Sequence, residues 1–162
     1  MPPADGSVSK TDKSRTQTRA RVRRRGFRDA ASLYLAVSLG AVIGSVLRAL
    51  ASMGSLALTG PGFPWGTLLV NVAGSFVICF YATLSGPDGR LFAGTWQRQF
   101  VMTGFCGGFT TFSTFSLETL RLALTGHQVL AALNVALSIA TWLVAAWVGH
   151  ALASRLNRLR GV

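Results

Sequence analysis

Carboxylate side chains are scarce in this sequence, which has only five Asp and Glu among 162 residues. Glu118 is the only acid inside an apolar run, so catalysis by paired carboxylates is excluded. Cys79 and Cys106 lie in apolar runs without a C-x-x-C spacing or a nearby histidine, which is typical of small buried side chains. Zinc-ligand spacings, a Walker loop and a G-x-S-x-G motif are also absent from the sequence. The sequence therefore favours a protein that is not an enzyme.

Charge of either sign is rare outside the two ends of the chain. Charged residues make up 13% of the sequence and hydrophobic residues 50%, whereas a soluble domain is about 25% charged. The net charge of +11 would suit a nucleic-acid-binding protein, but nine of the sixteen Lys and Arg fall in residues 1–28 and three more in 155–160. Because the middle of the chain is almost free of charge, the sequence indicates a protein that resides in the lipid bilayer and does not bind nucleic acid.

Four apolar runs are long enough to cross a bilayer as helices, since about 20 residues cross about 30 Å of hydrocarbon. The runs extend over Ala30 to about Met53, Trp65 to Leu84, about Phe100 to Leu117, and Val129 to Ala153, with links at 59–64, 85–90 and 125–128. We therefore predict an all-α membrane protein with four transmembrane helices. Residues 1–29 are expected to form a disordered basic tail, 30–154 the transmembrane domain, and 155–162 a short basic tail.

Basic residues are distributed unevenly between the two sides that four spans would create. Both ends and the middle link share one side with nine, three and two Lys and Arg residues, whereas the opposite side carries only Arg121. The positive-inside rule predicts cytoplasmic termini and a multi-pass protein of the plasma membrane. A cleaved twin-arginine signal peptide is an alternative, because RRGF (24–27) precedes the first run and ALA (49–51) follows it. Arg48 near the end of the run and the three spans that follow disfavour cleavage.

Three polar side chains inside the apolar runs each have two interpretations. Arg48 either extends to the lipid headgroups or draws an anion toward a pore mouth. Asn71 either joins two helices or donates its amide N–H to a passing ion, because an amide in hydrocarbon needs a partner. Ser138 either bonds back to its own helix or lines a path with Asn134, one turn before it.

The segment GFCGGFTTFSTFS (104–116) combines backbone freedom with hydroxyl groups at membrane depth. Gly107 and Gly108 predict a break in the third helix, which is tolerated only in a protein interior or beside a cavity. A break frees carbonyls that suit cations and a helix start that suits anions. Phe112 and Phe115 share a helix face, and aromatic ring edges carry positive density. Together with donors from Asn71, Ser113, Thr114 and Ser138, these rings would suit a dehydrated anion; a glycine-rich packing motif with phenylalanines facing lipid is the alternative.

Three motifs resemble one known family. GFCGGFTTFSTFSLE (104–118) is similar to the third-helix signature of the Fluc (CrcB) fluoride channels, GAVIGSVLR (40–48) to their first-helix pattern, and GTLLVNVAGSF (66–76) to their second-helix motif. The resemblance spans about residues 32–153. It implies a passive, selective channel that exports cytoplasmic fluoride, built as an antiparallel dimer of small four-helix subunits with two fluoride paths.

The resemblance also assigns roles to individual residues. It implies a fluoride path lined by Asn71, Phe112, Ser113, Thr114, Phe115 and Ser138, with Arg48 at the vestibule. It further implies a structural sodium ion, not transported, held by the backbone carbonyls of Gly107 and Thr110 where the two helix breaks cross.

Two features depart from the family pattern. Asn134 stands where the family often has tyrosine, and the charge bias predicts one fixed orientation. With one fixed orientation an antiparallel dimer needs an oppositely oriented paralogue; insertion in both orientations would let the chain pair with a second copy of itself. Two other functions are alternatives. A small multidrug-type exporter needs an acid in its first span, which is absent here; a membrane-tethered anion- or lipid-binding protein would use residues 1–28 and leave 104–116 unexplained.

Overall fold

The computed structural model describes the backbone of residues 7–87 and 89–158, with side chains from Gly26 onward. The elements are α1 (Ser7–Thr59), α2 (Trp65–Leu84), α3 (Thr95–Arg98), the π-helix η1 (Gln99–Cys106), α4 (Gly107–Phe109), α5 (Phe112–Leu124) and α6 (Gln128–Arg158). Within these ranges the chain is helical and forms no strand, which confirms the all-α prediction.

Three helices of the described chain are long and apolar enough to cross a membrane by themselves. They are Gly26–Thr59 of α1, α2 and α6. The predicted third span is not one helix: α3, η1 and α4 follow one another to Phe109, and α5 begins only at Phe112. The predicted break in the third span, from about Phe100 to Leu117, is therefore present, because residues 110 and 111 are extended.

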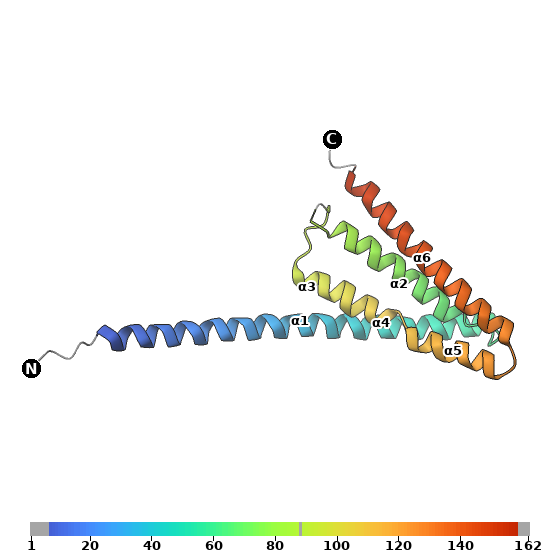
Figure 1. Cartoon of the computed structure of the whole chain (residues 1–162), viewed down its shortest axis with the longest axis horizontal. Helices are drawn as coiled ribbons and strands as arrows, with labels where there is room; N and C mark the ends of the chain where they lie inside the picture. The colour runs from blue at the N-terminus through green and yellow to red at the C-terminus, as the bar shows by residue number, and fades with distance from the viewer. Residues whose placement is uncertain (1–6, 88, 159–162) are drawn as a thin grey trace, which may run out of the picture.

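The basic segment before the first apolar run differs from expectation. Residues 1–6 lie outside the described part, but from Ser7 the backbone is helical and joins the apolar part of α1 without interruption. This stretch is rich in Arg and Lys, which have good helix propensity, and it lacks Gly and Pro until Gly26. Figure 1 shows this end of α1 extending away from the other helices. At the other end, α6 continues to Arg158, and residues 159–162 are not described. The domain limits at residues 29–30 and 154–155 stay predictions.

Two helix pairs hold the subunit together: α2 lies along α6, and α1 lies along η1 and α4 (Figure 1). Glycines spaced four apart allow the second pair to approach backbone to backbone. A Cβ on Gly40 or Gly44 would strike the main chain of η1 and α4, and one on Gly104 or Gly108 would strike the main chain of α1. Small residues four apart are a common way for membrane helices to pack closely.

A polar cluster joins α2 to α6 far from the helix break. The Asn157 amide donates to the Thr83 carbonyl at 3.0 Å and accepts from the Arg90 N–H at 3.1 Å. The Thr83 hydroxyl donates to the Cys79 carbonyl, so it accepts from Nδ1 of His150 at 2.9 Å. This cluster fixes the link that leads from α2 toward α3.

Candidate functional site

The break between α4 and α5 lies at two threonines. Thr110 has φ −84° and ψ 158°, and Thr111 has φ −150° and ψ 124°, both extended. The break was expected at Gly107 and Gly108, but Gly107 is helical at φ −65° and ψ −34°, and Gly108 packs against the main chain of Ala41. Gly108 thus serves the close approach of α4 to α1, whereas β-branched threonines suit the extended backbone.

The Asn71 side chain binds both backbone groups of Thr111. Its Nδ2 donates to the Thr111 carbonyl at 2.9 Å, and its Oδ1 accepts the Thr111 N–H at 2.7 Å. Asn71 is 5% exposed, so this pairing satisfies polar groups that the break would otherwise leave unpaired at membrane depth. An amide carries two N–H groups, so one of them remains for another acceptor.

The Thr111 side chain begins α5. Its Oγ1 accepts the N–H of Thr114 at 3.2 Å, which is an N-cap. The same hydroxyl donates to Oγ1 of Thr114 at 3.0 Å, so it can only accept from Ser113, whose Oγ lies 3.3 Å away. Because Thr114 Oγ1 accepts from Thr111, its own hydroxyl hydrogen remains available for a further acceptor. Thr111 was not a predicted site residue, although a Thr immediately before the first apolar residue of a helix is an N-cap signal.

Two backbone carbonyls at the break lose the donors that a continuous helix would give them. In a continuous helix the carbonyls of Gly107 and Thr110 would accept the N–H groups of Thr111 and Thr114. Here those two N–H groups bond to Asn71 Oδ1 and to Thr111 Oγ1 instead. The carbonyl of Gly108 is held from α1, by Nε of Arg48 at 3.1 Å and Oγ of Ser45 at 3.4 Å. Arg48 therefore contacts the break with its guanidinium group.

Phe112 and Phe115 lie beside each other, as their spacing predicts. Their ring centroids are 5.6 Å apart with planes tilted by 48°. Phe115 is 7% exposed, whereas Phe112 is 72% exposed on the surface of the single subunit. The pair thus presents one buried ring and one open ring next to the hydroxyls of α5.

The polar residues of α6 form a buried stripe toward α5. Asn134 donates to Oγ1 of Thr119 at 2.8 Å and is 1% exposed. Ser138 is also 1% exposed, and its Oγ has no hydrogen-bond partner within the described residues. Thr141, in contrast, donates to the Leu137 carbonyl of its own helix at 2.6 Å. The expected bond back to the helix is thus made by Thr141 and not by Ser138.

A cavity of about 300 Å³ lies at the break. Asn71, Gly107, Thr110, Thr111 and Phe112 line it, together with Trp142 of α6. Ser113, Thr114, Phe115, Ser138 and Arg48 lie outside its lining, although hydrogen bonds or ring contacts join Ser113, Thr114 and Phe115 to residues that line it. Trp142 was not a predicted site residue; a tryptophan in the middle of a span was the signal in the sequence, because tryptophans usually lie at membrane interfaces.

A second cavity, of about 620 Å³, lies at the end of α5 and is lined by Thr67, Glu118, Arg121 and His127 among others. Glu118 was expected to face headgroups or pair with Arg121. Both side chains line this cavity, and Oε2 of Glu118 is buried without a hydrogen-bond partner among the described residues. A cavity whose lining includes charged side chains therefore lies next to the helix that carries the two phenylalanines.

Comparison with known proteins places the chain in a family. The family model described as CrcB-like protein, Camphor Resistance (CrcB), matches residues 35–150. The chain is 59% identical over 134 residues to "Fluoride-specific ion channel FluC 1" of Rhodopseudomonas palustris (strain BisB18), covering 83% of this chain and 95% of that protein. It is 57% identical over 132 residues to the protein of that name in Bradyrhizobium diazoefficiens, covering 81% and 91%.

A third relative, "Fluoride-specific ion channel FluC" of Opitutus terrae, is 52% identical over 130 residues, covering 80% of this chain and 98% of that protein. The family model covers most of the chain and includes the break, the Asn71 pairing and both phenylalanines. The three motifs therefore resembled the right family, and this chain belongs to the CrcB family.

Proposed function

We propose that this chain is a subunit of a passive, selective fluoride channel that exports cytoplasmic fluoride, and that it is not an enzyme. The relatives named as fluoride-specific ion channels match over most of the chain. The observation that carries the proposal is the arrangement at the break, where Asn71 and Thr114 each keep one unused donor beside Phe112. The multidrug-exporter and lipid-tether alternatives have no comparable observation in their favour.

The donors fit an ion that is small, hard and strongly hydrated. The second amide N–H of Asn71, the Thr114 hydroxyl, the Ser138 hydroxyl and the ring edges of Phe112 and Phe115 all offer positive charge density without a full charge. Donors that are already oriented replace lost water at little reorganisation cost. Ser113 supports this set by donating to Thr111, and Arg48 near the break adds the positive potential that would attract an anion toward it.

No energy source beyond the membrane potential is needed. Hydrogen fluoride crosses lipid uncharged and dissociates inside the cell, and the negative interior then drives the anion out with about 2.3 kcal/mol per charge per 100 mV. The sequence holds no nucleotide motif, and its single acid within an apolar run, Glu118, does not form a proton relay by itself. Passive export is therefore the simplest mechanism.

We further propose that the path is completed by a second subunit in an antiparallel dimer, each subunit contributing four crossings of the plasma membrane. Phe112 is largely exposed, Gly107 is exposed, and the cavity at the break is open to the surface of the subunit. An exposed ring, and carbonyls without helical donors, need a covering partner at membrane depth. The partner is a second copy of this chain or an oppositely oriented paralogue.

The donor set of the break suits a structural sodium ion at the dimer centre. The carbonyls of Gly107 and Thr110 have lost their helical donors, and hard cations bind oxygen ligands. Bound there, sodium would neutralise these carbonyls and join the two breaks. It would be structural and would not be transported.

Removal of sodium is expected to destabilise the dimer. Replacing sodium by N-methyl-D-glucamine on both sides of a liposome should slow fluoride efflux and lower the unfolding temperature, since an ion at about 100 times its Kd contributes about 2.7 kcal/mol. Restoring sodium should reverse both effects. Equal efflux rates and unfolding temperatures in the two buffers would show that these carbonyls hold no sodium.

The charge bias leads to a separate expectation about orientation. Because the basic residues cluster at both ends of the chain, both termini are expected in the cytoplasm in nearly every molecule. Labelling of cysteines introduced at each terminus by a membrane-impermeant reagent in intact cells measures this. A substantial labelled fraction at both ends would mean dual insertion and would remove the argument for a paralogue.

The test of the proposed function is fluoride efflux from liposomes that hold the purified protein, read with a fluoride electrode, with chloride efflux as the comparison. We expect rapid efflux of fluoride and none of chloride. Phe112→Ile should slow fluoride efflux at least about tenfold, because each loss of ~1.4 kcal/mol of interaction with the ion is a factor of ten.

Phe27→Ile is the matched control, because Phe27 is an equally exposed ring, 76% against 72%, on α1 outside the site. It should leave efflux unchanged. Absence of fluoride efflux from the wild-type chain, both alone and co-expressed with a paralogue, would exclude the proposed function.

A further inference from the structure

Trp142 occupies an unusual place for a tryptophan in a membrane helix. Trp65 and Trp96 begin or lie near the ends of helical segments, whereas Trp142 lies in the middle of α6. Its indole N–H is buried and has no nitrogen or oxygen partner within the described residues. Buried tryptophans usually find such a partner, and mid-span positions seldom hold tryptophan without a reason.

The contact that Trp142 makes instead is aromatic. Its ring lies 5.0 Å from the ring of Phe115, with the planes at 71°, which is an edge-to-face pair. Phe115 in turn lies 5.6 Å from Phe112. Three rings, from α6 through the buried Phe115 to the open Phe112, therefore form a row.

Trp142 also reaches the site directly. It is the only residue of α6 among those that line the cavity at the break, where it lies with Asn71, Thr111 and Phe112. Edge-to-face geometry is directional, because the positive edge of one ring meets the negative face of the other. A ring pair of this kind resists rotation of the Phe115 ring.

We propose that Trp142 is a positioning residue that fixes the ring orientation of Phe115 and thereby sets how strongly the path discriminates fluoride from larger anions. The proposal rests on the proposed channel function. A rotated Phe115 would present its negative face to an anion in place of its positive edge. The expected consequence is slower fluoride passage and weaker rejection of chloride, without loss of the folded subunit.

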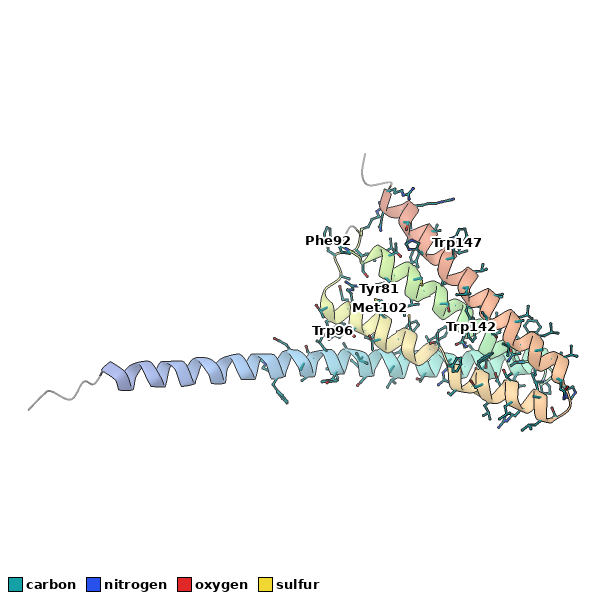
Figure 2. The ribbon with its side chains drawn as sticks, viewed as in Figure 1. Tyr81, Phe92, Trp96, Met102, Trp142 and Trp147 are labelled. Carbon is teal, nitrogen blue, oxygen red and sulfur yellow. The ribbon has the colours of Figure 1, made fainter. Side chains whose placement is uncertain are left out.

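The test compares two substitutions at Trp142 with one at Trp147. Trp147 lies five residues further on the same helix, is 69% exposed and serves as the matched control (Figure 2). Trp142→Leu, Trp142→Phe and Trp147→Leu are purified and reconstituted in parallel, and fluoride and chloride efflux are measured for each. Gel filtration in detergent verifies that every variant keeps the wild-type assembly.

Trp142→Leu should slow fluoride efflux about tenfold and lower the fluoride-to-chloride ratio, since an aromatic pair is worth up to about one factor of ten. Trp142→Phe keeps a ring beside Phe115 and should stay within about threefold of wild type. Trp147→Leu should change neither quantity. A structural role alone would change the yield or the assembly but leave the anion ratio of the folded fraction intact.

Two results would overturn the proposal. Wild-type rates and ratios in Trp142→Leu would show that Phe115 needs no support from Trp142. An equal loss in Trp142→Phe would show that the indole N–H, and not the ring contact, is what matters. Both results are measured against an active wild-type channel. A wild-type protein without fluoride efflux would instead contradict the proposed function itself, so failure of the proposed function and failure of the proposal about Trp142 are distinguishable.

Discussion

Asn71→Asp is expected to reduce fluoride efflux by at least about 100-fold while the subunit still folds. The substitution keeps the shape of the side chain and its acceptor for the Thr111 N–H. It replaces Nδ2, which now donates to the Thr111 carbonyl at 2.9 Å, by an oxygen. As a carboxylate the new side chain repels both that carbonyl and the anion; one unit charge 4 Å from another costs about 4 kcal/mol at an effective dielectric constant of 20. As a neutral acid it can bond to the carbonyl, but it has no second hydrogen for the ion.

The structure offers a close control for this substitution. Asn157 also binds two backbone groups with one amide, the carbonyl of Thr83 and the N–H of Arg90, at the far end of α6. Asn157→Asp therefore repeats the chemistry outside the site and should leave fluoride efflux near wild type. Electrode recordings from matched liposomes measure both variants. Similar efflux from wild type and Asn71→Asp would mean that Asn71 only joins helices.

Gly44→Val is expected to give the largest loss of stability. A Cβ at Gly44 would collide with the Phe105 carbonyl and lie 2.8 Å from the Phe109 N, and neither backbone atom can move aside like a flexible side chain. Overpacking of this kind costs about 1–3 kcal/mol, which lowers the unfolding temperature of a protein of this size by roughly 2–12 °C. Efflux should also fall, because Ser45 and Arg48 follow directly on α1 and hold the carbonyl of Gly108 at the break.

Gly54→Val separates this effect from the change in helix propensity on replacing glycine by valine. Gly54 lies on the same helix, and nothing lies within 4 Å of a Cβ built there. Thermal unfolding in detergent, followed by light scattering, compares the two variants with wild type. An equal fall in unfolding temperature for both substitutions would contradict the close approach of α1 to η1 and α4.

Local sequence predicted that the third helix breaks, but not where. Glycines and hydroxyls in 104–116 predicted a break, because a span that only faces lipid has no use for them. They did not predict its position. Gly107 and Gly108 have the greater backbone freedom, yet the break occurs at Thr110 and Thr111. Gly108 packs against the backbone of α1, so its lack of a side chain serves close approach and the residue does not form a bend. That competition exists only when both helices are in place.

For the polar residues Asn71 and Ser138, too, the sequence left the partner open and the fold decided it. Sequence alone left each with two interpretations, because a buried polar side chain must find some partner but its spacing does not say which. The fold places Asn71 opposite Thr111, forty residues away in the chain, so one side chain both joins α2 to the break and keeps a spare donor. Ser138 faces inward without a partner, whereas Thr141 bonds to its own helix. Trp142 was missed because its partner, Phe115, comes from another helix.

By itself the sequence determined the membrane as the environment, the all-helical class and the family, since hydropathy, helix length and long contiguous motifs are local properties. It also determined that 104–116 is not an ordinary span. The tertiary structure alone decided where the third helix breaks, which carbonyls lose their helical donors, and which donors stay unused. These depend on contacts between residues distant in the chain: α1 with α4, α2 with the break, and α6 with Phe115. In a bilayer every buried polar group needs a partner, and only packing of the helices assigns that partner.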